Sequence, residues 1–144
     1  MSNIEERFSY SLHTTARTWR QALDKRMKDL GISQSGWMTI ALVAKAAKPL
    51  SQIELANALG VEGPSMVAML DRLMKGGFIT REPSATDRRV KLVMLTDAGT
   101  ALYNKVITKA SVFRTELLKD IDPEQLRVAT ELLERLQDLL ERDA

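Results

Sequence analysis

Residues 51–95 read SQIELANALGVEGPSMVAMLDRLMKGGFITREPSATDRRVKLVML, and the order of caps and apolar positions in them predicts two short helices joined by a tight turn. Ser51 and Glu54 have the spacing of a capping box, which satisfies two unpaired N–H groups where a helix starts. Gly60 suits the left-handed position that ends this helix. Pro64 suits the first position of the next helix, where its missing N–H costs nothing. Together these features predict a helix-turn-helix.

The second of these helices has one apolar face and is followed by a hairpin. Its apolar side chains recur at helical spacing and would pack it against the first helix: Met66, Met69, Leu70 and Leu73. Residues 78–82 and 89–95 are rich in β-branched and large apolar residues, and the turn-forming residues 83–88 lie between them. A helix-turn-helix followed by such a hairpin is a winged helix.

Basic side chains gather on the second helix and on the hairpin. They are Arg72, Lys75, Arg81, Arg88, Arg89 and Lys91, against the acidic Asp71, Glu82 and Asp87. A winged helix of this kind fits a DNA duplex, because its second helix can enter the major groove while the wing reaches the backbone or the minor groove. The sequence therefore predicts double-stranded DNA as a partner.

Apolar residues at intervals of three and four predict long helices on both sides of this unit. The expected helices run over residues 4–30, from Ser33 or Ser35 to about residue 47, over 97–117 after a Thr96 cap, and over 123–140 after an Asp122 cap. The predicted fold class is mainly α with a small β-hairpin wing. We expect a single domain over residues 1–144, with the winged-helix unit at 33–95.

The helices at 1–31 and 97–144 carry apolar stripes that a small winged helix is too short to cover. The simplest way to bury them is against a second copy, which predicts a two-fold homodimer. Such a dimer would read an imperfect palindrome, with the two recognition helices about one DNA turn apart. The alternative is that these helices fold back into a monomeric bundle.

A family resemblance supports these expectations. Residues 87–96, DRRVKLVMLT, resemble the DxRxxxxxLT signature of the multiple-antibiotic-resistance regulator (MarR) family, and residues 64–81 resemble its recognition helix and first wing strand. Three stretches are similar to its SlyA branch: Trp19-Arg20, Leu30 and residues 33–37. The resemblance implies dimers with interlocked terminal helices, and regulators that accept small aromatic carboxylates such as salicylate.

The exposed face of the second helix is the predicted place of base contacts. We expect Pro64 and Ser65 near base edges or phosphate, and Arg72 on the DNA backbone. The alternative for Arg72 is a structural ion pair with Asp71 or Glu82.

The wing is the second predicted contact surface. The resemblance implies that Arg89 lies in or near the minor groove and that Asp87 orients it. Electrostatics supports this placement of Arg89, because a hairpin tip can present one guanidinium to a narrow A·T-rich groove of strong negative potential. Arg88 and Lys91 are expected on phosphate. The alternative for Arg89 and Lys91 is a solvated charged turn.

Ala68 stands where many SlyA-like relatives have a basic residue. This removes a bidentate guanine contact and leaves a thymine-methyl contact or shape readout. The full set of residues predicted to contact DNA is Ser51, Pro64, Ser65, Met66, Ala68, Arg72, Arg81, Asp87, Arg88, Arg89 and Lys91.

A ligand pocket is predicted between the long helices and the winged-helix unit. Arg17 follows His13, the single histidine, by about one helical turn, and an arginine beside aromatic surface suits a flat anionic ligand. The predicted ligand residues are His13, Arg17, Trp37, Met38 and Met69. The alternatives are an interface ion pair for Arg17, and core packing for Trp37 and the methionines.

The composition excludes several classes of protein. The 144 residues include one histidine and no cysteine, with no glycine-rich phosphate loop and no His–carboxylate metal spacing. An enzyme, a cofactor-binding protein and a metal sensor are therefore not expected. Residues 1–7 lack an apolar signal core, and no stretch is long enough to cross a bilayer, which predicts a cytoplasmic protein with no membrane partner.

These observations predict a dimeric, sequence-specific transcriptional regulator that small aromatic anions modulate. It would act as a repressor, or as an activator that displaces a silencing protein from promoter DNA. Two alternatives stay open: a winged helix that binds other proteins, and a ligand-independent architectural DNA-binding protein. The basic wing tip counts against the first, because protein binding does not need it.

Overall fold

The computed structural model describes residues 3–143, which form two units whose boundary lies between Ser111 and Val112. The elements are α1 (Ile4–Arg26), η1 (Lys28–Leu30), α2 (Gln34–Lys45), β1 (Leu50–Ser51), α3 (Gln52–Leu59), α4 (Gly63–Lys75), β2 (Ile79–Pro83), β3 (Lys91–Leu95), α5 (Asp97–Leu118) and α6 (Pro123–Asp143). The boundary falls inside α5, so the second unit holds the end of α5 and all of α6. The predicted fold class, mainly helical with a small β wing, is confirmed.

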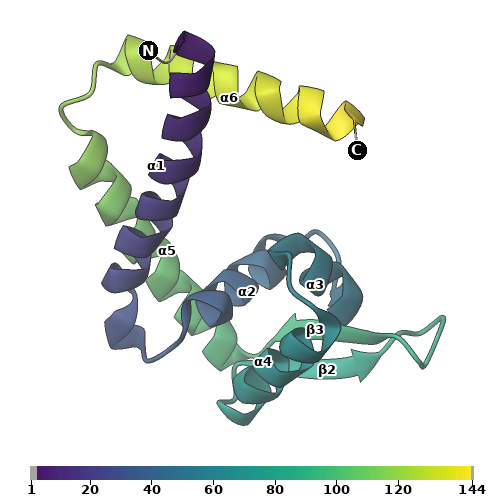
Figure 1. Ribbon diagram of the computed structural model, residues 1–144. Helices are drawn as coiled ribbons and strands as arrows, with labels where there is room; N and C mark the ends of the chain where they lie inside the picture. Colours follow the sequence, from purple (N-terminus) through teal and green to yellow (C-terminus); the bar gives the residue numbers. More distant parts are fainter. Residues whose placement is uncertain (1–2, 144) are drawn as a thin grey trace. The chain divides into compact units, whose positions relative to one another are not determined.

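Three antiparallel strands form the sheet of the first unit, in the order β1-β3-β2. β2 pairs with β3 along its whole length, from Ile79 to Pro83, and the hairpin projects beyond α3 and α4 (Figure 1). β1 adds two residues to the other edge of β3, with Leu50 opposite Val93. A strand of two residues is too short to show the alternation that reveals a strand in a sequence, so β1 was not among the predicted elements.

The second wing strand begins at Lys91 instead of Arg89, two residues later than predicted. The backbone stays in a turn up to Val90, whose N–H donates to the Asp87 carbonyl at 3.0 Å. The Val90 carbonyl in turn accepts the Ser84 N–H at 2.8 Å. Arg89 therefore lies in the turn at the tip of the wing.

The helix-turn-helix has the predicted caps. The Ser51 N–H donates to the Glu54 carboxylate at 3.0 Å and the Glu54 N–H donates to the Ser51 hydroxyl at 3.1 Å, which completes the capping box of α3. Gly60 ends α3 in the left-handed region, at a φ of 68°. α4 begins at Gly63, so Pro64 occupies its second position instead of its first. There too an N–H would have no partner within the helix.

One hydrophobic core joins α2, α3, α4, the sheet and the start of α5. The four apolar residues predicted to pack α4 are all buried. They meet buried side chains of the neighbouring elements: Ile40, Leu55, Ala56, Ile79, Val93 and Leu102. Gly99 lets α5 approach the start of β2, because a Cβ at this position would lie 2.0 Å from the Phe78 carbonyl oxygen. α5 therefore packs closely against the base of the wing.

The first helix is shorter than the predicted span of residues 4–30. α1 ends at Arg26 and a single 3₁₀ turn, η1, follows. Met27, between the two, is fully buried in a second cluster with Trp37 and Val106. Burying a methionine gives about 1.5–3 kcal/mol, which exceeds the propensity lost when a helix stops early.

α6, in the second unit, starts at the predicted place. Pro123 is its first residue, and the Leu126 N–H donates to the Asp122 carbonyl at 3.0 Å. No residue of α6 is buried. Its exposed large apolar side chains are Leu126, Val128, Leu132, Leu133, Leu139 and Leu140. Among residues 3–143, no helix combines the length and the apolar character that crossing a membrane requires.

Candidate nucleic-acid interface

The exposed face of α4 carries four of the residues predicted to contact DNA: Pro64, Ser65, Ala68 and Arg72. Asp71 binds Arg81, and within residues 3–143 Arg72 forms no ion pair, so the alternative pairing of Arg72 with Asp71 or Glu82 is not found. Met66, which was predicted as a contact too, is buried in the core and turns its side chain away from this face.

Asp87 holds Arg89 at the tip of the wing. Its carboxylate accepts the Arg89 backbone N–H at 3.0 Å, the guanidinium Nε at 3.1 Å and Nη2 at 3.2 Å. The guanidinium lowers the pKa of the Asp87 carboxyl below its ordinary value. The Arg89 side chain is nevertheless 90% exposed. Beside it, Arg88 and Lys91 are exposed and make no ion pair with any described residue.

Two other predicted contacts use their polar atoms inside the protein. Ser51 is buried, and its hydroxyl caps α3. Arg81, on β2, donates to the side chains of Gln52, Asp71 and Met74. These partners are between 7 and 29 residues away in the sequence, so no local pattern pointed to them.

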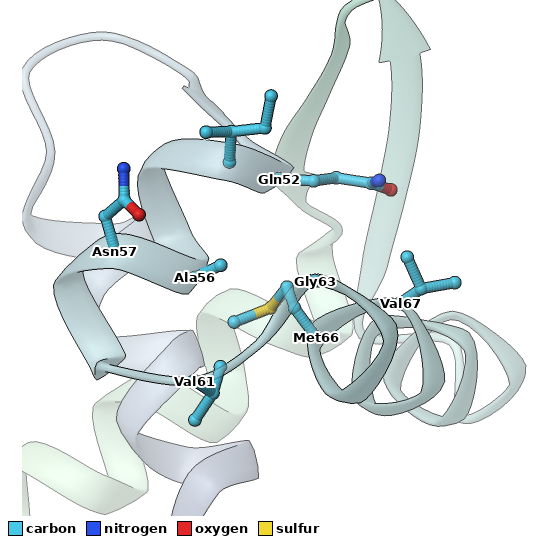
Figure 2. Close-up of a pocket in the computed structure, with 8 residues that line it drawn as sticks. Gln52, Ala56, Asn57, Val61, Gly63, Met66 and Val67 are labelled. Carbon is cyan, nitrogen blue, oxygen red and sulfur yellow. The ribbon is translucent and has the colours of Figure 1, made fainter.

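A groove of about 290 Å³ lies between α3 and α4, next to the exposed face of α4 (Figure 2). It is lined by Gln52, Ile53, Ala56, Asn57, Val61, Gly63, Met66 and Val67. Ile53 and Val67 are exposed, and Figure 2 shows Val67 on the outer side of α4. These two residues were not among the predicted contacts, although each is an apolar residue on the polar side of its helix. Exposed apolar side chains beside a recognition helix can contact thymine methyl groups.

The predicted ligand residues of α1 and α2 lie in different places on the first unit. His13 and Arg17 are exposed on α1. Trp37 is buried, and its indole N–H donates to Asp24 at 3.0 Å. Asp24 follows Arg17 by seven residues, which is about 10 Å along a helix. Arg17 and Trp37 are therefore separated by roughly two helical turns.

The two methionines predicted to bind a ligand pack in the core. Met38 packs against the cluster around Met27, and the Met69 sulfur accepts the Thr39 hydroxyl at 3.3 Å. Met69 also lines a cleft of about 340 Å³ between the start of α2 and the end of α4, together with Arg72. Among the described residues, no three His, Asp or Glu side chains are grouped as metal ligands.

Known proteins share this architecture. The family model of the MarR family matches residues 33–91. The crystal structure of transcriptional regulator PA3341 is 34% identical over 94% of this chain and 98% of that chain, with a TM-score of 0.83. Staphylococcus aureus MarR in complex with salicylate and kanamycin is 22% identical over 98% of this chain and 95% of that chain, with a TM-score of 0.85. A MarR transcriptional regulator from Methanosarcina mazei is 20% identical over 96% and 99%, with a TM-score of 0.84.

The last two similarities, at their low identities, show the fold alone. The first extends at higher identity over nearly all of both chains, and the family model covers α2, the helix-turn-helix and the wing. This chain belongs to the MarR family of transcriptional regulators.

Proposed function

We propose that this chain is a dimeric, sequence-specific DNA-binding regulator, in which α4 enters the major groove and the wing tip reaches the adjacent minor groove. The main support for the proposal is the position of the Arg89 side chain at the wing tip. Its guanidinium is almost fully exposed, yet two bonds to Asp87 hold it in one orientation. A side chain already held in place loses less entropy on binding. The narrow minor groove of A·T-rich DNA, with its strong negative potential, suits such an arginine.

The remaining contacts divide by their chemistry. Arg72, Arg88 and Lys91 bind phosphate, which positions the protein but carries no sequence information. Ser65, near the start of α4, lies at base edges together with Pro64. Ala68 presents a methyl group, so it favours a thymine methyl over a guanine. The proposed contact set leaves out the predicted residues whose side chains are used inside the protein: Ser51, Met66 and Arg81.

Residues 1–31 and 97–144 are proposed to join two copies. The supporting observation is the exposure of apolar side chains on α6 and on α1, where they are Ile4, Phe8, Tyr10 and Leu12. Burial of both faces against a second copy removes this apolar surface from water. Two recognition helices would then lie roughly 34 Å apart, so the operator is expected to be an imperfect palindrome.

Modulation by a small aromatic carboxylate, in a SlyA-like branch of the family, is the finer part of the proposal. Salicylate is present in the complex of the S. aureus neighbour. Two cations suit a carboxylate: Arg17 on α1, and Arg72 in the cleft between the start of α2 and the end of α4. A ligand bound beside α1 or α4 would change the spacing of the two recognition helices, so that both could no longer bind one duplex at the same time. The same geometry serves a cytoplasmic repressor or a countersilencing activator.

The test begins with the purified full chain at micromolar concentration. Sedimentation velocity measures its mass, and selection of bound duplexes from a random library at low salt finds its preferred site, with and without salicylate. We expect a dimer and an enriched palindrome with half-sites about one DNA turn apart. Salicylate should weaken DNA binding by the wild type. The factor by which it weakens binding is then compared in Arg17→Ala and Arg72→Ala, and the variant that has lost this response identifies the arginine that binds the ligand.

Four outcomes would each contradict a different part of the proposal. A chain that binds no duplex at low ionic strength overturns the DNA-binding function. Binding without base preference supports the architectural alternative, and an unpaired single half-site contradicts the dimer. If salicylate leaves the selected sites and their binding unchanged, modulation by this ligand is contradicted, but DNA binding by a dimer is not.

A further inference from the structure

We propose that Arg81 is a positioning residue, which fixes α4 relative to the wing and to α3 and does not itself bind DNA. The inference rests on the proposed DNA-binding function and concerns how its two contact surfaces are held at a fixed separation. Arg81 lies in β2, opposite Val93 of β3 in the central strand of the sheet. It is therefore attached to the most firmly paired part of the wing.

Each nitrogen of the Arg81 guanidinium donates to a different side chain. Nη2 is 2.5 Å from the Asp71 carboxylate, Nη1 is 3.2 Å from the Gln52 amide oxygen, and Nε is 3.4 Å from the Met74 sulfur. Asp71 and Met74 belong to α4, and Gln52 is the first residue of α3. One planar group thus ties the wing to both helices of the helix-turn-helix, and we call these four residues the Arg81 clamp.

The clamp spans the corner between α4 and β2. The chain reverses there at Gly76 and Gly77, and Gly77 adopts a φ of 83°. Two backbone bonds close the corner, from the Phe78 N–H to the Leu73 carbonyl at 3.0 Å and from the Thr96 N–H to the Phe78 carbonyl at 3.1 Å, and the Arg81 side chain adds bonds to α4 and α3. A guanidinium has its donors in a rigid plane, so three bonds from it define a direction that a single ammonium cannot.

The position of Asp71 is the second argument for this role. Its side chain is 58% exposed, and it directly precedes Arg72 on the helix that we propose enters the major groove. An unpaired carboxylate there would repel phosphate and weaken binding to every duplex. Asp71 fits such a surface only if its charge is matched, and Arg81, whose side chain is 21% exposed, matches it from the inner side.

Neutralising Asp71 gives an experiment in which the clamp and a simple effect of charge predict opposite changes in affinity for the operator. Asp71→Asn removes a negative charge beside the DNA, so simple electrostatics predicts tighter binding to all duplexes. The clamp predicts that affinity for the selected operator falls about fivefold, because α4 and Arg89 are no longer held at the spacing of two adjacent grooves. Affinity for a random duplex, which needs no fixed spacing, should be unchanged or higher.

Glu82→Gln is the matched control. Glu82 is the exposed neighbour of Arg81, and within residues 3–143 it makes no ion pair. Its neutralisation should tighten binding to operator and random duplex alike, by the same small factor. If Asp71→Asn also tightened binding to operator and random duplex by the same factor, the proposal would be overturned.

Arg81→Lys separates positioning from a direct phosphate contact. A lysine keeps the charge and would preserve a phosphate contact, but it cannot reproduce the three directed bonds. We expect Arg81→Lys to lose operator affinity as Asp71→Asn does, with the salt dependence of binding unchanged. Wild-type operator affinity in Arg81→Lys would assign Arg81 to the DNA instead.

Hydrogen exchange tests the clamp without DNA. In the wild type and in Asp71→Asn, circular dichroism checks the fold and amide exchange is followed for residues 74–81. We expect faster exchange at this corner in the variant and equal exchange in the core of α4. Equal exchange throughout contradicts the clamp, whereas failure of the wild type to bind any duplex contradicts only the proposed function.

Discussion

Two arginines of the wing each pair with an aspartate, and the two pairs face in opposite directions. In the pair at its base, Arg81 is largely buried and Asp71 is exposed. In the pair at its tip, Arg89 is exposed and Asp87 is half-buried. The same two residue types therefore join elements of the protein at the base and hold a cation toward solvent at the tip. The direction in which the arginine faces decides which of these roles a pair has.

The pairs also differ in how far apart their members lie along the chain. Asp87 and Arg89 are two residues apart, and the carboxylate binds both the backbone and the side chain of the arginine. Asp71 and Arg81 are ten residues apart and belong to different elements. The tip pair is thus a property of one turn, and the base pair exists only when α4 and the hairpin are packed together.

The largest expected effect concerns the tip. Arg89→Ala should reduce affinity for the selected operator at least about tenfold and lower the slope of log affinity against log salt by about one. The reason is the loss of one preoriented cation from the minor groove. Lys28→Ala, which removes an exposed positive charge from η1, is the control and should leave affinity nearly unchanged. Equal losses in the two variants would mean that only total charge matters.

The same substitution in both arginines should affect the stability of the protein differently. Arg81→Met should lower the free energy of unfolding by about 1–1.5 kcal/mol, since it removes three hydrogen bonds, one of them partly buried. Arg89→Met should change it by less than about 0.5 kcal/mol, because the side chain is exposed. Urea unfolding of both variants provides the values. Similar losses would erase the proposed distinction between base and tip.

Ser51→Ala extends the comparison to a serine that was predicted to contact DNA and is used inside the protein. Loss of the hydroxyl breaks the capping box of α3 and should cost about 1 kcal/mol of stability. Ser51→Thr, which keeps the oxygen, should recover most of this loss. Operator affinity, corrected for the folded fraction, should stay at the wild-type value in both. A loss of affinity without a loss of stability would return Ser51 to the contact set.

The smallest effect is a titration at the tip. Arg89 holds the pKa of the Asp87 carboxyl below its ordinary value. Because the folded-state pKa is the lower one, the pair stabilises the protein above the ordinary aspartate pKa, and this contribution is lost as the pH falls through the depressed value. In Arg89→Ala, carbon-13 NMR should find the Asp87 pKa moved upward.

The return of the Asp87 pKa should be partial, because the backbone N–H of residue 89 still donates to the carboxylate. Asp29 is the internal reference. Lys109 lowers its pKa through a bond of 2.9 Å that lies outside the wing, so Arg89→Ala should not change it. An Asp87 pKa that stays at its wild-type value in Arg89→Ala would show that the guanidinium does not hold the carboxylate in solution.

Several features of the fold and of the candidate site follow from short-range patterns. The capping box of α3 links residues three apart, and Gly60 needs a left-handed backbone wherever a helix turns in this way. The buried face of α4 follows from the helical period, which also leaves Ser65, Ala68 and Arg72 exposed. The tip arginine is placed by a turn that contains its own partner.

Other features depend on residues that meet only in the folded chain. The helix predicted over residues 4–30 stops at Arg26, because Met27 is buried against Trp37 and Val106, which come from two later helices. β1 exists because β3 offers it an edge.

The helix caps, the amphipathic faces and the charged tip of the wing could be predicted from the sequence, because these depend on residues within about one helical turn or one β-turn of each other. That Arg81 faces inward and Arg89 outward depends instead on how the chain folds. Both are arginines with an aspartate in reach, and the burial of a long side chain depends on what packs around it. For Arg81 that is α3 and α4, whose contacting residues lie up to 29 positions away.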